Sequence, residues 1–259
     1  MAEATIPIVE IKGVSKLFQL QDQTINALSE ANLSIHKGEF VCLIGASGCG
    51  KSTLLRIIAG FEKPSSGEAL MWGKPIEGPD PSRGMVFQDY ALFPWLSVRD
   101  NIAFGPIARG LSGGEVKTIV DKFIELVGLG TFANAYPHQL SGGMKQRVAI
   151  ARVLANDAEV VLMDEPFGAL DAMTRERLQD ELLEIWERTK LTVVFVTHSV
   201  EEAIFLANRV VVMTPGPGRI ESDNALDLAR PRDVASPEFN AIRRVLAARL
   251  HSHHGKKAA

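Results

Sequence analysis

The sequence predicts an α/β fold with a parallel sheet, an N-terminal antiparallel β subdomain and an inserted helical subdomain. Apolar runs of strand length alternate with helical segments over residues 39–59 and 159–196, the order that is typical of parallel sheets. Short alternations of apolar and polar residues over 9–11, 25–28 and 31–35 favour antiparallel strands at the front of the chain. From residue 98 the apolar residues follow a helical spacing, and we expect the helical subdomain at about 98–155.

The elements follow one another in a consistent order. His36-Lys37-Gly38 is expected to form a turn, and residues 39–44 a buried strand. A helix is expected at 53–59, and the Pro and Gly of residues 64–67 break the chain after it. Further strands are expected at 68–72, 84–88, 159–163 and 191–196, and helices at 98–130, 146–154 and 171–188. Two helices have an apolar face at helical spacing: Ile119, Val120, Phe123, Leu126 and Val127 in one, and Leu178, Leu182, Ile185 and Trp186 in the other.

The composition is that of an ordinary soluble protein, with 46% hydrophobic and 23% charged residues. The 259 residues suffice for one large domain, which we place at 1–235, with a C-terminal helix at 236–250 and a flexible tail at 251–259. The histidines of that tail suggest a solvated end rather than a metal site. The net charge of −3 gives no support for nucleic acid as a partner.

The chain shows no sign of entering a membrane or being secreted. The apolar runs 160–163 and 193–196 are far shorter than the about 20 residues that a bilayer requires. Met1–Ala4 lacks a basic stretch followed by an apolar one, and the only two cysteines, Cys42 and Cys49, favour a reducing compartment. We therefore expect a protein of the cytosol that meets a membrane only through a partner.

Gly45-Ala46-Ser47-Gly48-Cys49-Gly50-Lys51-Ser52 fits the phosphate-loop pattern G-x-x-x-x-G-K-[ST], between a predicted strand and a predicted helix. The glycines let successive amide groups turn toward one anion at the positive end of the helix dipole. Lys51 is expected to reach the β- and γ-phosphates and Ser52 to bind Mg²⁺. A chance Gly-rich turn is the weaker interpretation, since all spaced residues are present. The predicted nucleoside triphosphate site comprises Gly45, Ser47, Gly48, Cys49, Gly50, Lys51, Ser52 and Thr53.

Two carboxylates, Asp164 and Glu165, end the apolar strand Val160–Met163. Strand ends of this kind deliver side chains to the crevice where α/β sheets bind ligands. Asp164 is placed to hold Mg²⁺, and Glu165 to accept a proton from water that attacks the γ-phosphate. Solvated acids at a strand end are the other interpretation, which the nearby phosphate loop makes the weaker one.

Leu140-Ser141-Gly142-Gly143-Met144-Lys145-Gln146-Arg147 is the second distinctive stretch. Ser141 is a good N-cap, so the stretch offers a second helix N-terminus for an anion. The phosphate loop, this stretch, Asp164-Glu165, Ala169-Leu170-Asp171 and Thr197-His198 stand in the order found in ABC-type ATPases, the nucleotide-binding subunits of ATP-binding-cassette transporters. The chain resembles that family from about residue 8 to at least 222.

The resemblance implies a site shared by two copies that pack head to tail. Each ATP would lie between the phosphate loop of one copy and Ser141, Gly142 and Gly143 of the other. It also implies the remaining roles: Gln88 at Mg²⁺ and the attacking water, His198 at the γ-phosphate, Asp171 at the dimer contact, and Phe18 against adenine. Phe18 could equally be a core residue.

Leu111-Ser112-Gly113-Gly114-Glu115 repeats the first letters of the same signature but lacks the Gln-Arg that follows it. Ser112 and Glu115 have the spacing of a capping box. We interpret this stretch as a helix start without a catalytic role.

Residues 89–101, 213–220, 229–233 and 236–239 resemble importers of the nitrate, aliphatic-sulfonate and taurine type. The resemblance implies that transmembrane permease subunits dock over about Gln88–Phe104, that an extracytoplasmic solute-binding protein delivers the solute, and that the chain is peripheral at the cytoplasmic face of the inner membrane. A plain loop and closing turns are the other interpretation of these stretches. An exporter subunit, a soluble cassette of DNA repair or translation, and a nucleotide kinase are the alternative functions.

Overall fold

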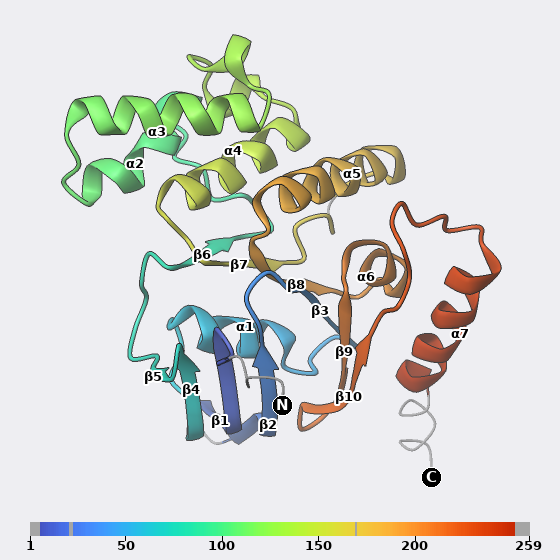
Figure 1. The fold of residues 1–259 in the computed structure, drawn as a ribbon. Coiled ribbons are helices and arrows are strands. Elements are labelled where there is room, and N and C mark those ends of the chain that lie inside the picture. The colour runs from blue at the N-terminus through green and yellow to red at the C-terminus, as the bar shows by residue number, and fades with distance from the viewer. Residues whose placement is uncertain (1–5, 21–22, 169, 252–259) are drawn as a thin grey trace. The chain divides into compact units, whose positions relative to one another are not determined.

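The computed structural model describes residues 6–20, 23–168 and 170–251, and the chain divides into two compact units (Figure 1). The first unit contains the chain up to Pro79 and from Leu191 onward, and the second contains Asp80–Lys190. Residues 252–259, with most of the histidine-containing tail, and residues 1–5 lie outside the described part. No helix in the described part is long and apolar enough to cross a membrane.

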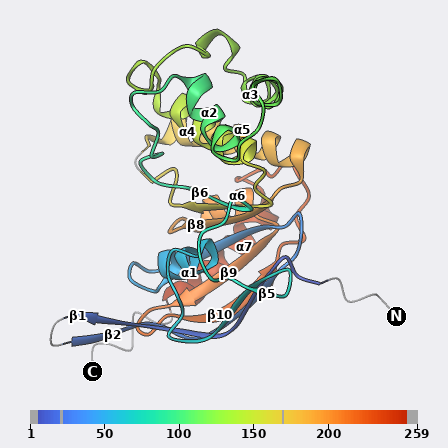
Figure 2. The same ribbon diagram turned by 90° about the vertical axis from the view of Figure 1, so that its left-hand side faces the viewer.

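An antiparallel sheet forms the front of the first unit, with strand order β2-β1-β4-β5. Its strands are β1 (Val9–Leu20), β2 (Gln23–Ile35), β4 (Ser66–Met71) and β5 (Lys74–Pro75). Figure 2 shows β1 and β2 running alongside each other, paired from Val9 with Ile35 to Leu20 with Gln23. The antiparallel prediction is confirmed, but the two strands expected at 25–28 and 31–35 are one strand, because pairing with β1 carries β2 through Glu30 at a φ of 49°.

The remaining strands of this unit are parallel except for β10. β3 (Phe40–Gly45) pairs in parallel with both β8 (Thr192–Thr197) and β9 (Arg209–Thr214), and β10 (Arg219–Ala225) runs antiparallel to β9. All residues of β3 and β8 are buried, as expected for strands covered on both faces. The helices of the unit are α1 (Lys51–Ala59), α6 (Val200–Leu206) and α7 (Pro237–His251). The predicted α/β class is confirmed.

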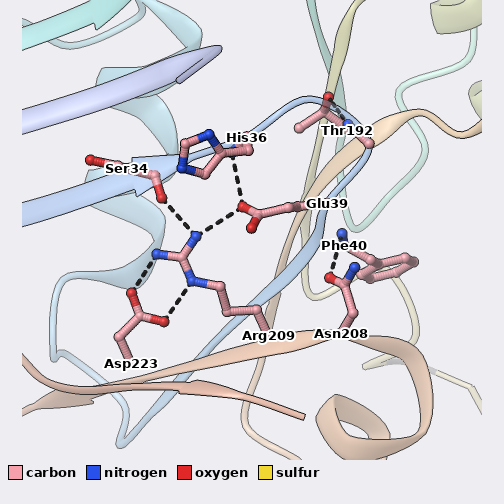
Figure 3. A network of polar contacts seen from close by, with 9 residues as sticks. Ser34, His36, Glu39, Phe40, Thr192, Asn208, Arg209 and Asp223 are labelled. Atoms are coloured by element: carbon pink, nitrogen blue, oxygen red, sulfur yellow. Dashed lines mark hydrogen bonds and ion pairs between the residues drawn. The ribbon is translucent and has the colours of Figure 1, made fainter. Parts of the chain in front are cut away.

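Arg209, the first residue of β9, joins the two kinds of sheet within this unit (Figure 3). Its guanidinium donates hydrogen bonds to the Asp223 carboxylate of β10 at 2.6 Å, to the Ser34 carbonyl of β2 at 2.7 Å and to the Glu39 carboxylate at 2.8 Å. The hydrogen bond with Asp223 is the main reason why the pKa of Arg209 is raised. These charged contacts are only partly exposed, so solvent weakens them less than it weakens surface ion pairs. They hold the end of β2 against the start of β9.

The second unit contains the parallel pair β6 (Arg83–Val86) and β7 (Val160–Asp164) and four longer helices. These are α2 (Val98–Ala108), α3 (Gly113–Leu126), α4 (Gly142–Ala155) and α5 (Ala172–Thr189), with short 3₁₀ turns at Gly130–Phe132 and Pro137–Gln139. Helices α2, α3 and α4 pack on one another (Figure 1). The region expected to be helical from 98 to 130 contains α2 and α3, with Gly110 at a φ of 79° between them, and α3 begins at the helix start expected at Ser112.

The capping box predicted for Ser112 and Glu115 is confirmed. The Glu115 amide donates to Ser112 Oγ at 3.4 Å, and the Ser112 amide donates to Glu115 Oε2 at 2.9 Å. The buried face of α3 is narrower than the sequence suggests: Val120 and Ile124 are buried, whereas Ile119 and Phe123 are half-buried. Helix α3 packs on α2 and α4, and the two residues that are buried, Val120 and Ile124, are one helical turn apart. In α5 the predicted stripe of Leu178, Leu182, Ile185 and Trp186 is buried.

Candidate functional site

The phosphate loop lies in the first unit, between the end of β3 at Gly45 and the start of α1 at Lys51. Gly50, the N-cap of α1, has a φ of 88°, a conformation that glycine adopts at little cost. Lys51 is buried, and its ammonium group donates to the carbonyl oxygens of Gly45 at 2.8 Å and Ala46 at 3.1 Å. The sequence motif therefore forms a tight turn around one positive charge, directly before a helix N-terminus.

Cys49 is the one thiol in this loop, and it is buried. Burial raises the pKa of the Cys49 thiol, and the neighbouring Lys51 ammonium opposes this only in part. A neutral thiol packed inside the loop fills space and keeps the turn compact.

The expected residues His198 and Phe18 also lie in the first unit. His198 is exposed and directly follows β8, whose Thr197 pairs with Ile44 of β3, so His198 lies next to the start of the phosphate loop. Phe18 is half-buried in β1, and Lys16 Nζ lies 4.9 Å from the centre of its ring.

The other predicted catalytic residues come from the second unit, at one edge of the β6–β7 pair. Val86 of β6 pairs with Met163 of β7, so Gln88 and the carboxylates Asp164 and Glu165 follow at the same ends of parallel strands. An ideal Cβ on Gly168 would lie 3.3 Å from Gln88 Nε2 and 3.7 Å from Glu165 Oε2. The side chains of Gln88 and Glu165 therefore reach the same glycine. Glu165 has a φ of 47°, an unusual backbone conformation for a residue that ends a strand.

The signature stretch begins helix α4 as predicted. Ser141 is exposed, and its hydroxyl accepts a hydrogen bond from the Met144 amide at 3.3 Å. Gly143 is buried, and an ideal Cβ there would lie 2.8 Å from Leu178 of α5. Asp171 is the N-cap of α5 and accepts from the Thr174 amide at 3.0 Å, the contact that chiefly lowers the pKa of Asp171. Ala169 lies outside the described residues.

The structure adds one residue that sequence reasoning did not find. Arg152 of α4 donates hydrogen bonds to the carbonyl oxygens of Ala91 at 2.7 Å and Tyr90 at 3.2 Å. Tyr90 and Ala91 both have positive φ angles, 62° and 43°, so the arginine stabilises an uncommon backbone conformation just after Gln88. Nothing in the local sequence distinguishes Arg152 from any other arginine on a helix.

Residues 28–168 match the ABC transporter family. The chain belongs to this family. The matched segment contains the phosphate loop, the Ser141 signature and the Asp164-Glu165 pair, so the resemblance inferred from these motifs is confirmed. This ABC cassette is accordingly an ATP hydrolase of the ABC type.

Several relatives are similar over most of the cassette. The aliphatic sulfonates import ATP-binding protein of Bacillus cereus is 48% identical over 91% of this chain and 93% of its own length. The taurine import ATP-binding protein of Roseobacter denitrificans is 49% identical over 85% and 83%, respectively. The nitrate import ATP-binding protein of Synechocystis is 48% identical over 89% and 86%.

Solved structures show the same fold. A dimeric ATP-binding cassette in a post-hydrolysis state, bound to ADP and Pi, is 35% identical, with a TM-score of 0.72 over 85% of this chain and 100% of that one. A Clostridium perfringens cassette that is part of an ABC transporter complex is 29% identical, with a TM-score of 0.77 over 96% and 99%. These likenesses agree with the ABC fold inferred from the strands and helices.

Proposed function

We propose that this cassette is the ATP-hydrolysing subunit of an importer that takes up a small solute of the nitrate, sulfonate or taurine type. The observation that carries the proposal is the similarity, at 48–49% identity, to three proteins whose names assign them to import of these solutes. Partner membrane subunits would carry the solute, and an extracytoplasmic binding protein would deliver it. The cassette would then lie at the cytoplasmic face of the inner membrane.

In this proposal the active form is a dimer of two cassettes. Each ATP lies between residues 45–53 of one copy and Ser141, Gly142 and Gly143 of the other. Two helix N-termini, those of α1 and α4, would then hold one polyphosphate. The related cassette that was solved as a dimer with ADP and Pi supports this arrangement.

The proposed chemistry assigns a role to each polar side chain. Glu165 accepts a proton from the water that attacks the γ-phosphate, and Gln88, which reaches the same glycine, orients that water. His198 contacts the γ-phosphate, and Phe18 stacks on adenine. Ser52, Gln88 and Asp164 offer hydroxyl, amide and carboxylate oxygens, the donor chemistry that suits Mg²⁺. When bound, Mg²⁺ would neutralise phosphate charge.

The segment Gln88–Phe104 is proposed to receive the membrane subunits. Phe93 packs against Trp95 and Phe104, with ring centres 5.7 Å and 4.5 Å apart. Trp95 is 71% exposed and Phe104 is 47% exposed, so the aromatic cluster of Phe93, Trp95 and Phe104 faces outward. Exposed aromatic clusters of this kind commonly anchor protein interfaces. Arg152 lies 5.5 Å from the centre of the Phe93 ring and holds the preceding carbonyls, which keeps the cluster in place.

Uptake measurements in cells test the importer proposal. A strain that lacks this gene is complemented with the wild-type chain or with Glu165→Gln, and the uptake of labelled nitrate, taurine and an alkanesulfonate is measured. We expect the wild type alone to restore uptake of one of these solutes. Export of a solute instead, or the uptake of none of these solutes by the wild type, would contradict import and favour the exporter or the soluble cassette.

A further inference from the structure

The turn between β9 and β10 touches the phosphate loop. An ideal Cβ on Gly218, in that turn, would lie 2.1 Å from the carbonyl oxygen of Cys49 and 2.9 Å from its carbonyl carbon. No side chain fits at such distances, and the atoms in the way belong to the backbone, which yields less readily than a side-chain end. A glycine at this position therefore allows the turn to lie directly against the loop.

Hydrogen bonds attach the same turn to β2. The Gly218 amide donates to the Ala27 carbonyl at 3.2 Å, and the Ser29 amide donates to the Gly218 carbonyl at 2.9 Å. Arg219 Nη2 adds a contact to Ser29 Oγ at 3.3 Å. With these bonds on both sides of Gly218, the turn cannot move away from the loop without breaking backbone pairing.

The strands next to the turn also reach the loop. An ideal Cβ on Gly50 would lie 2.6 Å from the Ala27 carbonyl oxygen, the acceptor that also binds the Gly218 amide. An ideal Cβ on Gly45 would lie 2.6 Å from the carbonyl oxygen of Met213, near the end of β9. The loop thus meets backbone of β2 and of the β9–β10 hairpin at its beginning, middle and end.

We propose that Gly218 is a positioning residue for ATP binding: the β9–β10 turn holds the Cys49 peptide so that the loop amides face the phosphates. The proposal rests on the phosphate loop being the nucleotide site. Loop amides bind a polyphosphate only when several of them point to it together, so a small shift of one peptide weakens the whole set. The turn contributes this orientation without touching the nucleotide.

Gly218→Ala tests the proposal through two separate readouts, the Kd for Mg·ADP and Mg·ATP by titration calorimetry and the free energy of unfolding by urea titration. We expect the Kd to rise about tenfold or more, as for the loss of an amide–phosphate hydrogen bond, with the kcat at saturating ATP changed less than the KM. An unchanged Kd with reduced stability would show that the turn can be disturbed without changing the orientation of the loop amides, and would overturn the proposal.

Gly216→Ala is the matched control, since Gly216 lies in the same turn and a Cβ there meets nothing within 4 Å. Its φ of 44° means that alanine strains the turn, so its stability should fall while the Kd stays at the wild-type value. An equal loss of affinity in both variants would point to general damage to the turn and also contradict the proposal.

If Gly218→Ala does not fold, Arg219→Ala tests the proposal with a smaller change. Arg219→Ala removes the contact with Ser29 but places no atom against the loop. We expect a Kd raised about twofold to fivefold, because the turn is held less firmly. If Gly218→Ala does not fold and Arg219→Ala binds like the wild type, the proposal is wrong. Failure of the wild-type chain to bind Mg·ADP would instead refute the nucleotide site itself.

Discussion

The Arg147 guanidinium of α4 lies 3.3 Å from the Glu181 carboxylate of α5. The side chains of Arg147 and Glu181 are 18% and 24% exposed. Arg147 Nη1 also donates to the Val127 carbonyl at 3.0 Å, at the end of α3. One arginine of the signature stretch therefore connects α3, α4 and α5. Through it, the helix that Ser141 begins is tied to the helix that Asp171 begins.

We expect Glu181→Ala to lower the free energy of unfolding by about 1–3 kcal/mol, because it leaves Arg147 half-buried and without its carboxylate partner. Urea titration of Glu181→Ala, Arg147→Ala and the double variant measures the coupling. Arg177→Ala, alone and combined with Glu181→Ala, is the control, since Arg177 also pairs with Glu181 but is 69% exposed, and its loss should cost less than about 1 kcal/mol. Coupling energies that are equal for the two arginines would contradict the structural role given to Arg147.

The two similar stretches that contain Ser112 and Ser141 should differ sharply in function. Ser112→Ala removes a helix cap, so we expect about 1 kcal/mol less stability and nearly unchanged ATP turnover. Ser141→Arg places a bulky cation at the start of α4, and turnover should be abolished. Steady-state phosphate release measures the ATP turnover of both variants, and urea titration measures the stability of Ser112→Ala. Equal losses of turnover would show that the assignment of the signature to Ser141 is wrong.

Glu165→Gln should retain Mg·ATP binding and lose turnover by about 100-fold or more, because an amide cannot accept the proton of the attacking water. With hydrolysis blocked, the variant should also form an ATP-dependent dimer, which light scattering detects as a doubled mass. Glu176→Gln, an exposed change on α5, is the control. A monomer that still hydrolyses ATP would contradict both the assignment of Glu165 as the base and the dimer mechanism.

Trp95→Ala should leave ATP turnover of the isolated cassette unchanged, because Trp95 is 71% exposed and its ring packs against Phe93, which has no proposed role in ATP hydrolysis. Binding to the membrane subunits should weaken by about tenfold or more if the ring is an interface anchor. Pull-down of the membrane subunits from detergent extracts measures this. Trp72→Ala is a control, since Trp72 is an exposed tryptophan at the end of β4. Equal recovery with both variants would place the docking surface elsewhere.

Local features could be predicted from the sequence, since these depend on residues that are close together in the chain. The phosphate loop between a buried strand and a helix, the caps at Ser112 and Ser141, and the buried stripe of α5 all follow from short patterns. The family follows from the order of these motifs. The roles of Glu165, Gln88, His198 and Phe18 remain predictions.

Features that depend on contacts between distant segments became visible only in the folded structure. The pairing with β1 makes one strand of 23–35, and the packing on α2 and α4 selects the buried face of α3. Gly218 is an ordinary turn residue in the sequence, and its importance comes from the Cys49 carbonyl, a group distant along the chain. Close approach between distant backbone segments leaves no periodic pattern, so no reading of neighbouring residues could predict it.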